Sequence, residues 1–152
     1  MKSIMETHSV ASVLNSALSN TTAYKKTFIG ILIVEDEDFV REAAAEILRS
    51  CGYRVHAARN FTEAVELFHR YSDQLKLLLT DIVIPGRNGR ELVNVLRGFS
   101  PQLKVLYISG YSENMITRQA ALEANACYIP KPFSSHSLLK AIEIALGKDD
   151  SA

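Results

Sequence analysis

Residues that could do chemistry follow four of the short aliphatic runs in the chain. Glu35 and Asp36 come after the first run, Asp81 follows the third, Ser109 closes the fourth and Lys131 follows the fifth. If the ends of these runs meet, three carboxylates, a hydroxyl and an ammonium group share one small region. Clustered carboxylates repel one another strongly unless a cation shares them. The residue types therefore indicate a cation site.

The chemistry of such a set centres on phosphate. Carboxylate oxygens, with water completing the shell, suit Mg²⁺ or Mn²⁺. A divalent metal beside a carboxylate, a lysine and a hydroxyl is also what phosphoryl transfer needs, because positioning and charge neutralisation carry most of that catalysis. One carboxylate can then act as the nucleophile and form an acyl phosphate.

The elements that must position these groups alternate between short β-rich runs and longer segments of helical period. This alternation is typical of βαβ units and a parallel sheet. We predict an α/β fold with a doubly wound, five-stranded parallel sheet, in which ligands bind at the carboxyl ends of the strands. The predicted strands are residues 29–34, 54–57, 76–80, 104–109 and 127–130.

Capping residues mark the boundaries of five helices. Gly52 suits a left-handed cap at the end of the first helix, and Asn60 suits the N-cap of the second. The third begins at residue 88 or 89 and ends before Ser100, which precedes a proline. The predicted helices are residues 39–50, 61–71, 88 or 89 to 99, 112 or 113 to 124, and 134 or 135 to 147.

The composition indicates one domain without a strong global charge. The chain has 152 residues, of which 47% are hydrophobic, enough for one well-buried core. Acidic and basic residues balance at 17 each, so we expect no direct binding to nucleic acid or to a membrane surface. We expect the domain to occupy residues 28–147, after an N-terminal extension or linker at 1–27 and before a tail at 148–152.

The cysteines and histidines show no metal-ligand or disulfide pattern. Cys51 and Cys127 lack C-x-x-C spacing, and we expect both to be reduced and mostly buried in a cytoplasmic protein. The apolar runs are far shorter than the roughly 20 residues that a membrane span requires. We expect surface or core-edge positions for His8, His56, His69 and His136.

Four motifs at the strand ends resemble those of the response-regulator receiver family. In chain order they are LIVEDED, LLLTDIVIPGRNG, VLYISGYSE and YIPKPF, and together they span roughly residues 28 to 147. The resemblance implies a flavodoxin-like strand order of 2-1-3-4-5 with helices on both faces. It also implies a phosphoacceptor domain of a two-component or phosphorelay system, which catalyses only its own phosphorylation and dephosphorylation.

The resemblance gives the residues at the strand ends their roles. Asp81 is the phosphoacceptor, and Lys131 is its ion-pair partner. Asp36 binds the metal directly, whereas Glu35 binds it through water. The carboxylate of Asp81 and the backbone carbonyl of Val83 are the further metal ligands.

The same resemblance implies a switch between two states. Ser109 is the hydroxyl that binds the phosphoryl group, and Tyr128 is the aromatic residue whose rotamer reports the state. The Lys131–Pro132 peptide bond is expected to be cis. The family's usual Gly-Ala before the last strand is replaced, so either that loop is one residue shorter or Asn125 adopts a left-handed conformation.

Two further departures from the family pattern concern the site itself. The acidic pair is Glu35-Asp36, whereas two aspartates are more frequent in the family. The longer glutamate side chain is expected to alter the metal affinity. Gly110 after the switch serine leaves the site open to phosphodonors. Tyr111 and Val83 occupy positions whose side chains tune the rate of dephosphorylation.

The expected partners are a sensor histidine kinase or a histidine phosphotransfer protein, with a downstream protein target. Whether the domain is a stand-alone regulator or part of a hybrid kinase stays open. One alternative is a metal-dependent phosphohydrolase with an aspartyl-phosphate intermediate, although Val83 stands where a second acidic residue would be needed. Another is a receiver-like interaction module that takes no phosphate, which the joint presence of the acidic pair, Asp81, Ser109 and Lys131 disfavours.

Each motif alone also has a structural explanation. Glu35 and Asp36 could only be favourable charges at the start of a helix. Asp81 beside Pro85-Gly86 could only form a turn. Their occurrence together at several strand ends is what favours a site.

Overall fold

The computed structural model describes residues 29–110 and 113–147. The expectations for the extension at 1–27, the tail at 148–152, His8 and Tyr111 concern residues outside these ranges. Ser112, one of the two candidate starts of the fourth helix, also lies outside them. Among the described helices, none combines the length and the apolar character needed to cross a membrane.

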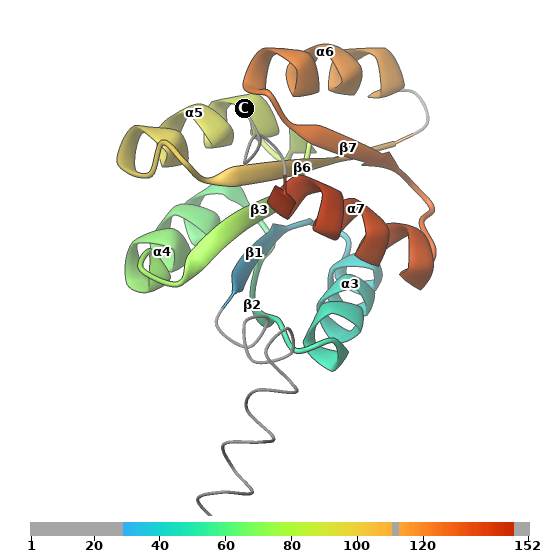
Figure 1. Cartoon of the computed structure of the whole chain (residues 1–152). Helices are drawn as coiled ribbons and strands as arrows, with labels where there is room; N and C mark the ends of the chain where they lie inside the picture. The colour runs from blue at the N-terminus through green and yellow to red at the C-terminus, as the bar shows by residue number, and fades with distance from the viewer. Residues whose placement is uncertain (1–28, 111–112, 148–152) are drawn as a thin grey trace, which may run out of the picture.

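Five parallel strands form the central sheet in the order β2-β1-β3-β6-β7 (Figure 1). This is the predicted order 2-1-3-4-5, once the two strands of a small separate hairpin are set aside. The strands are β1 (Gly30–Val34), β2 (Arg54–Ala58), β3 (Leu75–Asp81), β6 (Lys104–Ser109) and β7 (Cys127–Pro130). Each predicted strand boundary lies within one residue of the observed one.

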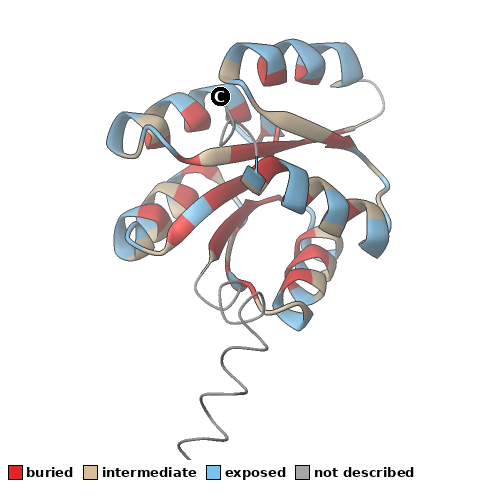
Figure 2. Ribbon diagram, in the orientation of Figure 1, coloured by how far each residue is buried: buried red, intermediate tan, exposed pale blue. Residues whose placement is uncertain are grey.

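Helices cover both faces of this sheet (Figure 1). On one face, α3 and α7 pack over β1, β3, β6 and β7, and α4, α5 and α6 pack on the other face. Burial on both sides explains why β1 has no exposed residue, as the colouring in Figure 2 shows. The helices are α3 (Asp38–Ser50), α4 (Phe61–Tyr71), α5 (Gly89–Phe99), α6 (Asn114–Ala124) and α7 (Ser135–Gly147).

The predicted caps form. Asn60 accepts a hydrogen bond from the backbone of Glu63 at 2.8 Å, and Asn88 accepts one from Glu91 at 2.9 Å. Gly52 has φ 96°, so it supplies the left-handed residue after α3. Asn125 has φ 51° and ends α6, which decides between the two possibilities for that loop.

The sequence did not predict the two-stranded hairpin after β3. Strands β4 (Val83–Ile84) and β5 (Arg87–Asn88) pair antiparallel across Pro85 and Gly86, and Gly86 has φ 78°. Strands of two residues are too short to show an alternating pattern. The cysteines are free, as expected, but they are half-buried and not mostly buried, because both lie at the edges of the core.

Candidate functional site

Glu35 begins the loop after β1 and is hydrogen-bonded on both sides. Its backbone N–H donates to the carbonyl of Ala58 at 3.0 Å, which continues the contact with β2. Its side chain is only 1% exposed, and Oε2 accepts a hydrogen bond from the backbone of Glu37 at 2.9 Å. Asp36 is exposed next to it. The loop therefore presents one buried and one solvent-facing carboxylate.

Arg41 fixes this loop from within α3. The arginine is 8% exposed, and its guanidinium donates to the backbone carbonyl of Glu35 at 3.0 Å. It also forms an ion pair with Asp38 at 2.6 Å, which holds the pKa of that carboxyl below its ordinary value. Because a buried guanidinium needs its partners, the acidic loop and the start of α3 are held in one arrangement.

Asp81 is the last residue of β3 and is 6% exposed. Its backbone carbonyl accepts a hydrogen bond from the hydroxyl of Thr80 at 2.9 Å. The same carbonyl lies against Gly89, where a Cβ atom would collide with it. Glycine at the start of α5 therefore allows this helix to approach the strand end that carries Asp81.

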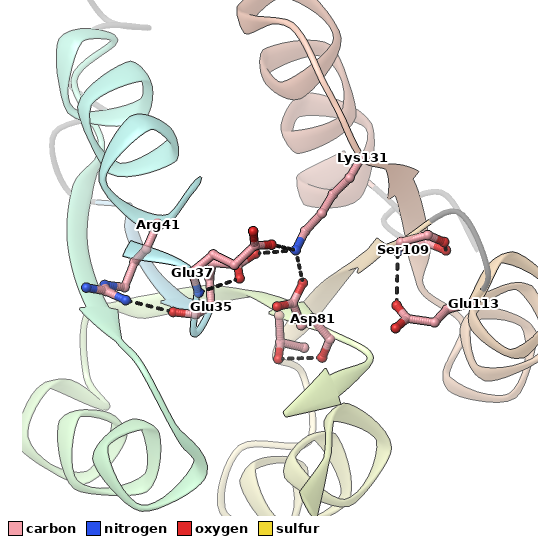
Figure 3. Close-up of polar contacts among 9 residues, drawn as sticks. Glu35, Glu37, Arg41, Asp81, Ser109, Glu113 and Lys131 are labelled. Carbon is pink, nitrogen blue, oxygen red and sulfur yellow. Dashed lines mark hydrogen bonds and ion pairs between the residues drawn. The ribbon is translucent and has the colours of Figure 1, made fainter. Parts of the chain in front are cut away.

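Lys131 brings the strand ends together, as Figure 3 shows. Its ammonium nitrogen lies 2.9 Å from Glu35 Oε1, 2.9 Å from Glu37 Oε1 and 3.3 Å from Asp81 Oδ1. The contact with Glu35 Oε1 is an ion pair, and that oxygen accepts no well-aligned hydrogen bond. The backbone N–H of Lys131 donates to Ser109 at 2.8 Å, and the bond to Pro132 is cis, as predicted.

Burial and charge set the protonation of this cluster. Burial, followed by the neighbouring carboxylate of Glu35, raises the pKa of Asp81 to about 8, although Lys131 opposes the shift. Burial alone would lower the pKa of Lys131, but Glu35, Glu37 and Asp81 together raise it above its ordinary value. Without another cation, the site thus holds more negative charge than one ammonium can neutralise.

The carboxylate arrangement fits a divalent metal ion. One oxygen from each of Glu35, Asp36 and Asp81 lies within 4.8 Å of the others. Oxygen donors at this density, with one residue open to water, match the preference of Mg²⁺ or Mn²⁺. Val83 lies two residues beyond Asp81 in β4, with its side chain 52% exposed.

The other two predicted site residues lie outside this cluster. Ser109 is fully buried at the end of β6, and its hydroxyl donates to the carbonyl of Gly110 at 3.1 Å. The backbone N–H of Gly110 donates to Glu113 at 3.0 Å. Tyr128 is half-buried in β7, and Arg118 Nε donates to its hydroxyl at 3.4 Å.

The structure therefore brings most of the predicted site residues close together. Glu35, Asp81 and Lys131 are in direct contact, and Asp36 completes the carboxylate group. Ser109 meets Lys131 through the backbone, whereas Tyr128 contacts the surface of α6.

Sequence reasoning missed Glu37 and Arg41. The only signal was the acidic run after β1, followed by an arginine three residues beyond Asp38.

Comparisons with known proteins identify the family of the chain. Residues 31–143 match the family described as the response regulator receiver domain. The chain is 35% identical over 120 residues to the sensor kinase CckA of Brucella abortus, covering 79% of this chain but 13% of CckA. It is 30% identical over 114 residues to the response regulator receiver protein CpdR of Brucella abortus, covering 74% of this chain and 92% of CpdR.

Solved structures give the same result. The receiver domain from the hybrid histidine kinase CckA superposes with a TM-score of 0.65 at 31% identity, covering 77% of this chain and 98% of that chain. A receiver domain protein from Clostridium thermocellum has a TM-score of 0.74 at 22% identity, covering 81% and 98%, which supports the fold alone.

Several relatives are much longer than this chain. It spans 13% of CckA, 30% of a cyclic di-GMP phosphodiesterase of Thermotoga maritima and 50% of the response regulator MprA of Mycobacterium tuberculosis.

Proposed function

Because the chain belongs to the response regulator receiver domain family of two-component signalling, we propose that it takes a phosphoryl group onto Asp81. One observation carries the proposal: the buried carboxylate of Asp81 lies 3.3 Å from the ammonium of Lys131 within a cluster of acidic side chains. A buried carboxylate that contacts an ammonium group at the carboxyl edge of a parallel sheet is placed to act as a nucleophile.

The reaction would form one bond and break one. A carboxylate oxygen of Asp81 attacks phosphorus, and the bond from phosphorus to the donor's imidazole nitrogen breaks. The electron pair stays with that nitrogen. Lys131 offsets the negative charge on the phosphoryl oxygens. Mg²⁺, held by Glu35, Asp36, Asp81 and the carbonyl of Val83, would supply the remaining counter-charge.

The response would pass through Ser109 and Tyr128. A phosphoryl group carries about two negative charges and strong acceptor oxygens, so it can draw the buried hydroxyl of Ser109 toward it. The space that Ser109 leaves would let Tyr128 turn inward from its contact with Arg118. This change would alter the surface formed by α6, β7 and α7.

The donor would be a phosphohistidine of a sensor histidine kinase or a histidine phosphotransfer protein. The likeness to the sensor kinase CckA and to the regulator CpdR supports this class of partner, because both names belong to signalling proteins.

Intact-mass spectrometry tests the proposal. Incubation with acetyl phosphate or phosphoramidate and Mg²⁺ should add one labile phosphoryl group to the protein. Asp81→Asn should abolish the addition, since an amide cannot form the acyl phosphate, and a chelator should abolish it in the parent. Undiminished labelling of Asp81→Asn would overturn the assignment. Sustained release of phosphate from an aryl phosphate, without labelled protein, would favour the phosphohydrolase instead.

A further inference from the structure

The ammonium of Lys131 contacts a carboxylate that lies outside the proposed metal cluster. Glu37 Oε1 lies 2.9 Å from the lysine nitrogen and accepts a hydrogen bond from it. This is closer than the 3.3 Å contact with Asp81. In the unphosphorylated domain, Lys131 is therefore bound more closely by the acidic loop than by the proposed phosphoacceptor (Figure 3).

Both ends of this contact are held by the backbone. The N–H of Glu37 donates to Glu35 at 2.9 Å, and the carbonyl of Glu37 accepts from Arg41 at 2.9 Å. On the other side, the backbone N–H of Lys131 donates to the backbone carbonyl of Ser109 at 2.8 Å. The ion pair thus bridges the start of α3 and the segment after β7, which are 94 residues apart in sequence.

A phosphoryl group on Asp81 would compete for this ammonium. It adds about two negative charges beside Asp81, and these need the lysine as a counter-charge. The carboxylate of Glu37 attracts the same ammonium and repels the incoming anion. Its side chain is 60% exposed, so water screens the interaction and the effect is modest.

We propose that Glu37 is a positioning residue that attracts the ammonium of Lys131 away from Asp81 in the unphosphorylated domain. The ion pair thereby lowers the affinity of the Asp81 site for a phosphoryl group. This inference rests on the proposed function. Glu37→Gln removes the charge but keeps the shape of the side chain, so the attraction that draws Lys131 away from Asp81 weakens, while the ion pair with Glu35 remains. The variant should bind a phosphoryl mimic about two- to five-fold more tightly than the parent.

Beryllofluoride, a phosphoryl mimic, provides the measurement. Its dissociation constant is determined from backbone amide shifts at saturating Mg²⁺ for the parent, Glu37→Gln and Glu46→Gln. Glu46 is an exposed residue of α3, the helix that begins directly after Glu37, so the control makes the same change in net charge. The ammonium signal of Lys131 is followed without the mimic, because release from Glu37 should speed the exchange of its protons with water.

Tighter binding by Glu37→Gln, with faster ammonium exchange and neither effect in Glu46→Gln, supports the inference. Equal binding by the parent and Glu37→Gln overturns it, and so does equal tightening by both variants, which would reflect net charge alone. Failure of the parent to bind beryllofluoride is a different result, and it would overturn the proposed function.

Discussion

Two regions of the molecule differ in how firmly their side chains are held. In the acidic site, which consists of Glu35, Asp36, Asp81 and Lys131, the side chains of Glu35 and Asp81 are buried, and Lys131 joins these two carboxylates at 3.3 Å or less. On the output face, formed by α6, β7 and α7, the half-buried Tyr128 packs against the core, and its hydroxyl accepts a long hydrogen bond of 3.4 Å from Arg118.

Apolar side chains on the output face are also open to solvent. Met115 is 84% exposed, Leu122 is 72% exposed and Ile144 is 55% exposed. Beside Tyr128, α6, β7 and α7 line a shallow cavity of about 330 Å³. Exposed apolar side chains around a cavity are typical of a surface that contacts a partner. The difference indicates that the groups of the acidic site are positioned in advance, and we expect the response to appear on the output face, where apolar side chains are exposed.

The largest effect on the free energy of unfolding should come from removing the ammonium group of Lys131 from the acidic site. Lys131→Ala leaves Glu35 and Asp81 buried without their ammonium, so we expect a loss of about 3 kcal/mol in the free energy of unfolding at pH 8 without metal. Urea denaturation measures it. Mg²⁺ should restore part of the loss, and Lys140→Ala, at an exposed lysine of α7, should change stability by less than about 0.5 kcal/mol. Equal effects of the two substitutions would contradict the contrast.

The pH dependence of stability should come next in size. Because the pKa of Asp81 is raised to about 8 in the folded state, the native protein binds this proton more tightly than the unfolded chain does. The resulting stabilisation is fully present below about pH 4 and is lost as the pH rises to about 8. Without metal, we therefore expect the free energy of unfolding to fall over this pH range. Asp81→Asn should lack this part of the pH profile.

A matched pair of arginine substitutions compares the two regions directly. Arg41→Gln removes a buried guanidinium from the carbonyl of Glu35, so we expect the free energy of unfolding to fall by about 1.5 kcal/mol. Arg118→Gln removes the long hydrogen bond to Tyr128, so we expect the free energy of unfolding to fall by less than about 0.5 kcal/mol. Thermal and urea unfolding measure both. A larger loss from Arg118→Gln would show that the output face is the more firmly held region.

The smallest effect on stability, but a clear one on the response, should come from Ser109→Ala. Asp81 should still accept a phosphoryl group, because the hydroxyl is not the nucleophile. The amide shifts that beryllofluoride causes in α6, β7 and α7 should shrink, whereas Ser109→Thr, which keeps the hydroxyl, should retain them. A full response in Ser109→Ala would mean that the signal leaves by another surface.

The sequence was sufficient for the sheet and for the strand ends. Aliphatic runs in a βαβ pattern require a parallel sheet, and this requirement alone brings Glu35, Asp81 and Lys131 to one edge. The left-handed Asn125 could be named as one of two outcomes, because few residues other than glycine and asparagine tolerate that conformation.

The contacts across loops could not be predicted in the same way. Periodicity reports which face of an element is buried, but not which distant group a long side chain contacts. The bond from Arg41 to Glu35 and the bridge from Glu37 to Lys131 are both such contacts. The hairpin of β4 and β5 was missed because two-residue strands carry no pattern.

The most direct test of the central claim locates the phosphoryl group chemically. Borohydride reduces an acyl phosphate to an alcohol, so a phosphorylated aspartate becomes homoserine. Cleavage after Lys76 and Arg87 releases residues 77–87, in which Asp81 is the single carboxylate side chain. After incubation with a phosphodonor and Mg²⁺, peptide mass spectrometry should find homoserine at Asp81. Homoserine in another peptide, or none after incubation, would contradict the account.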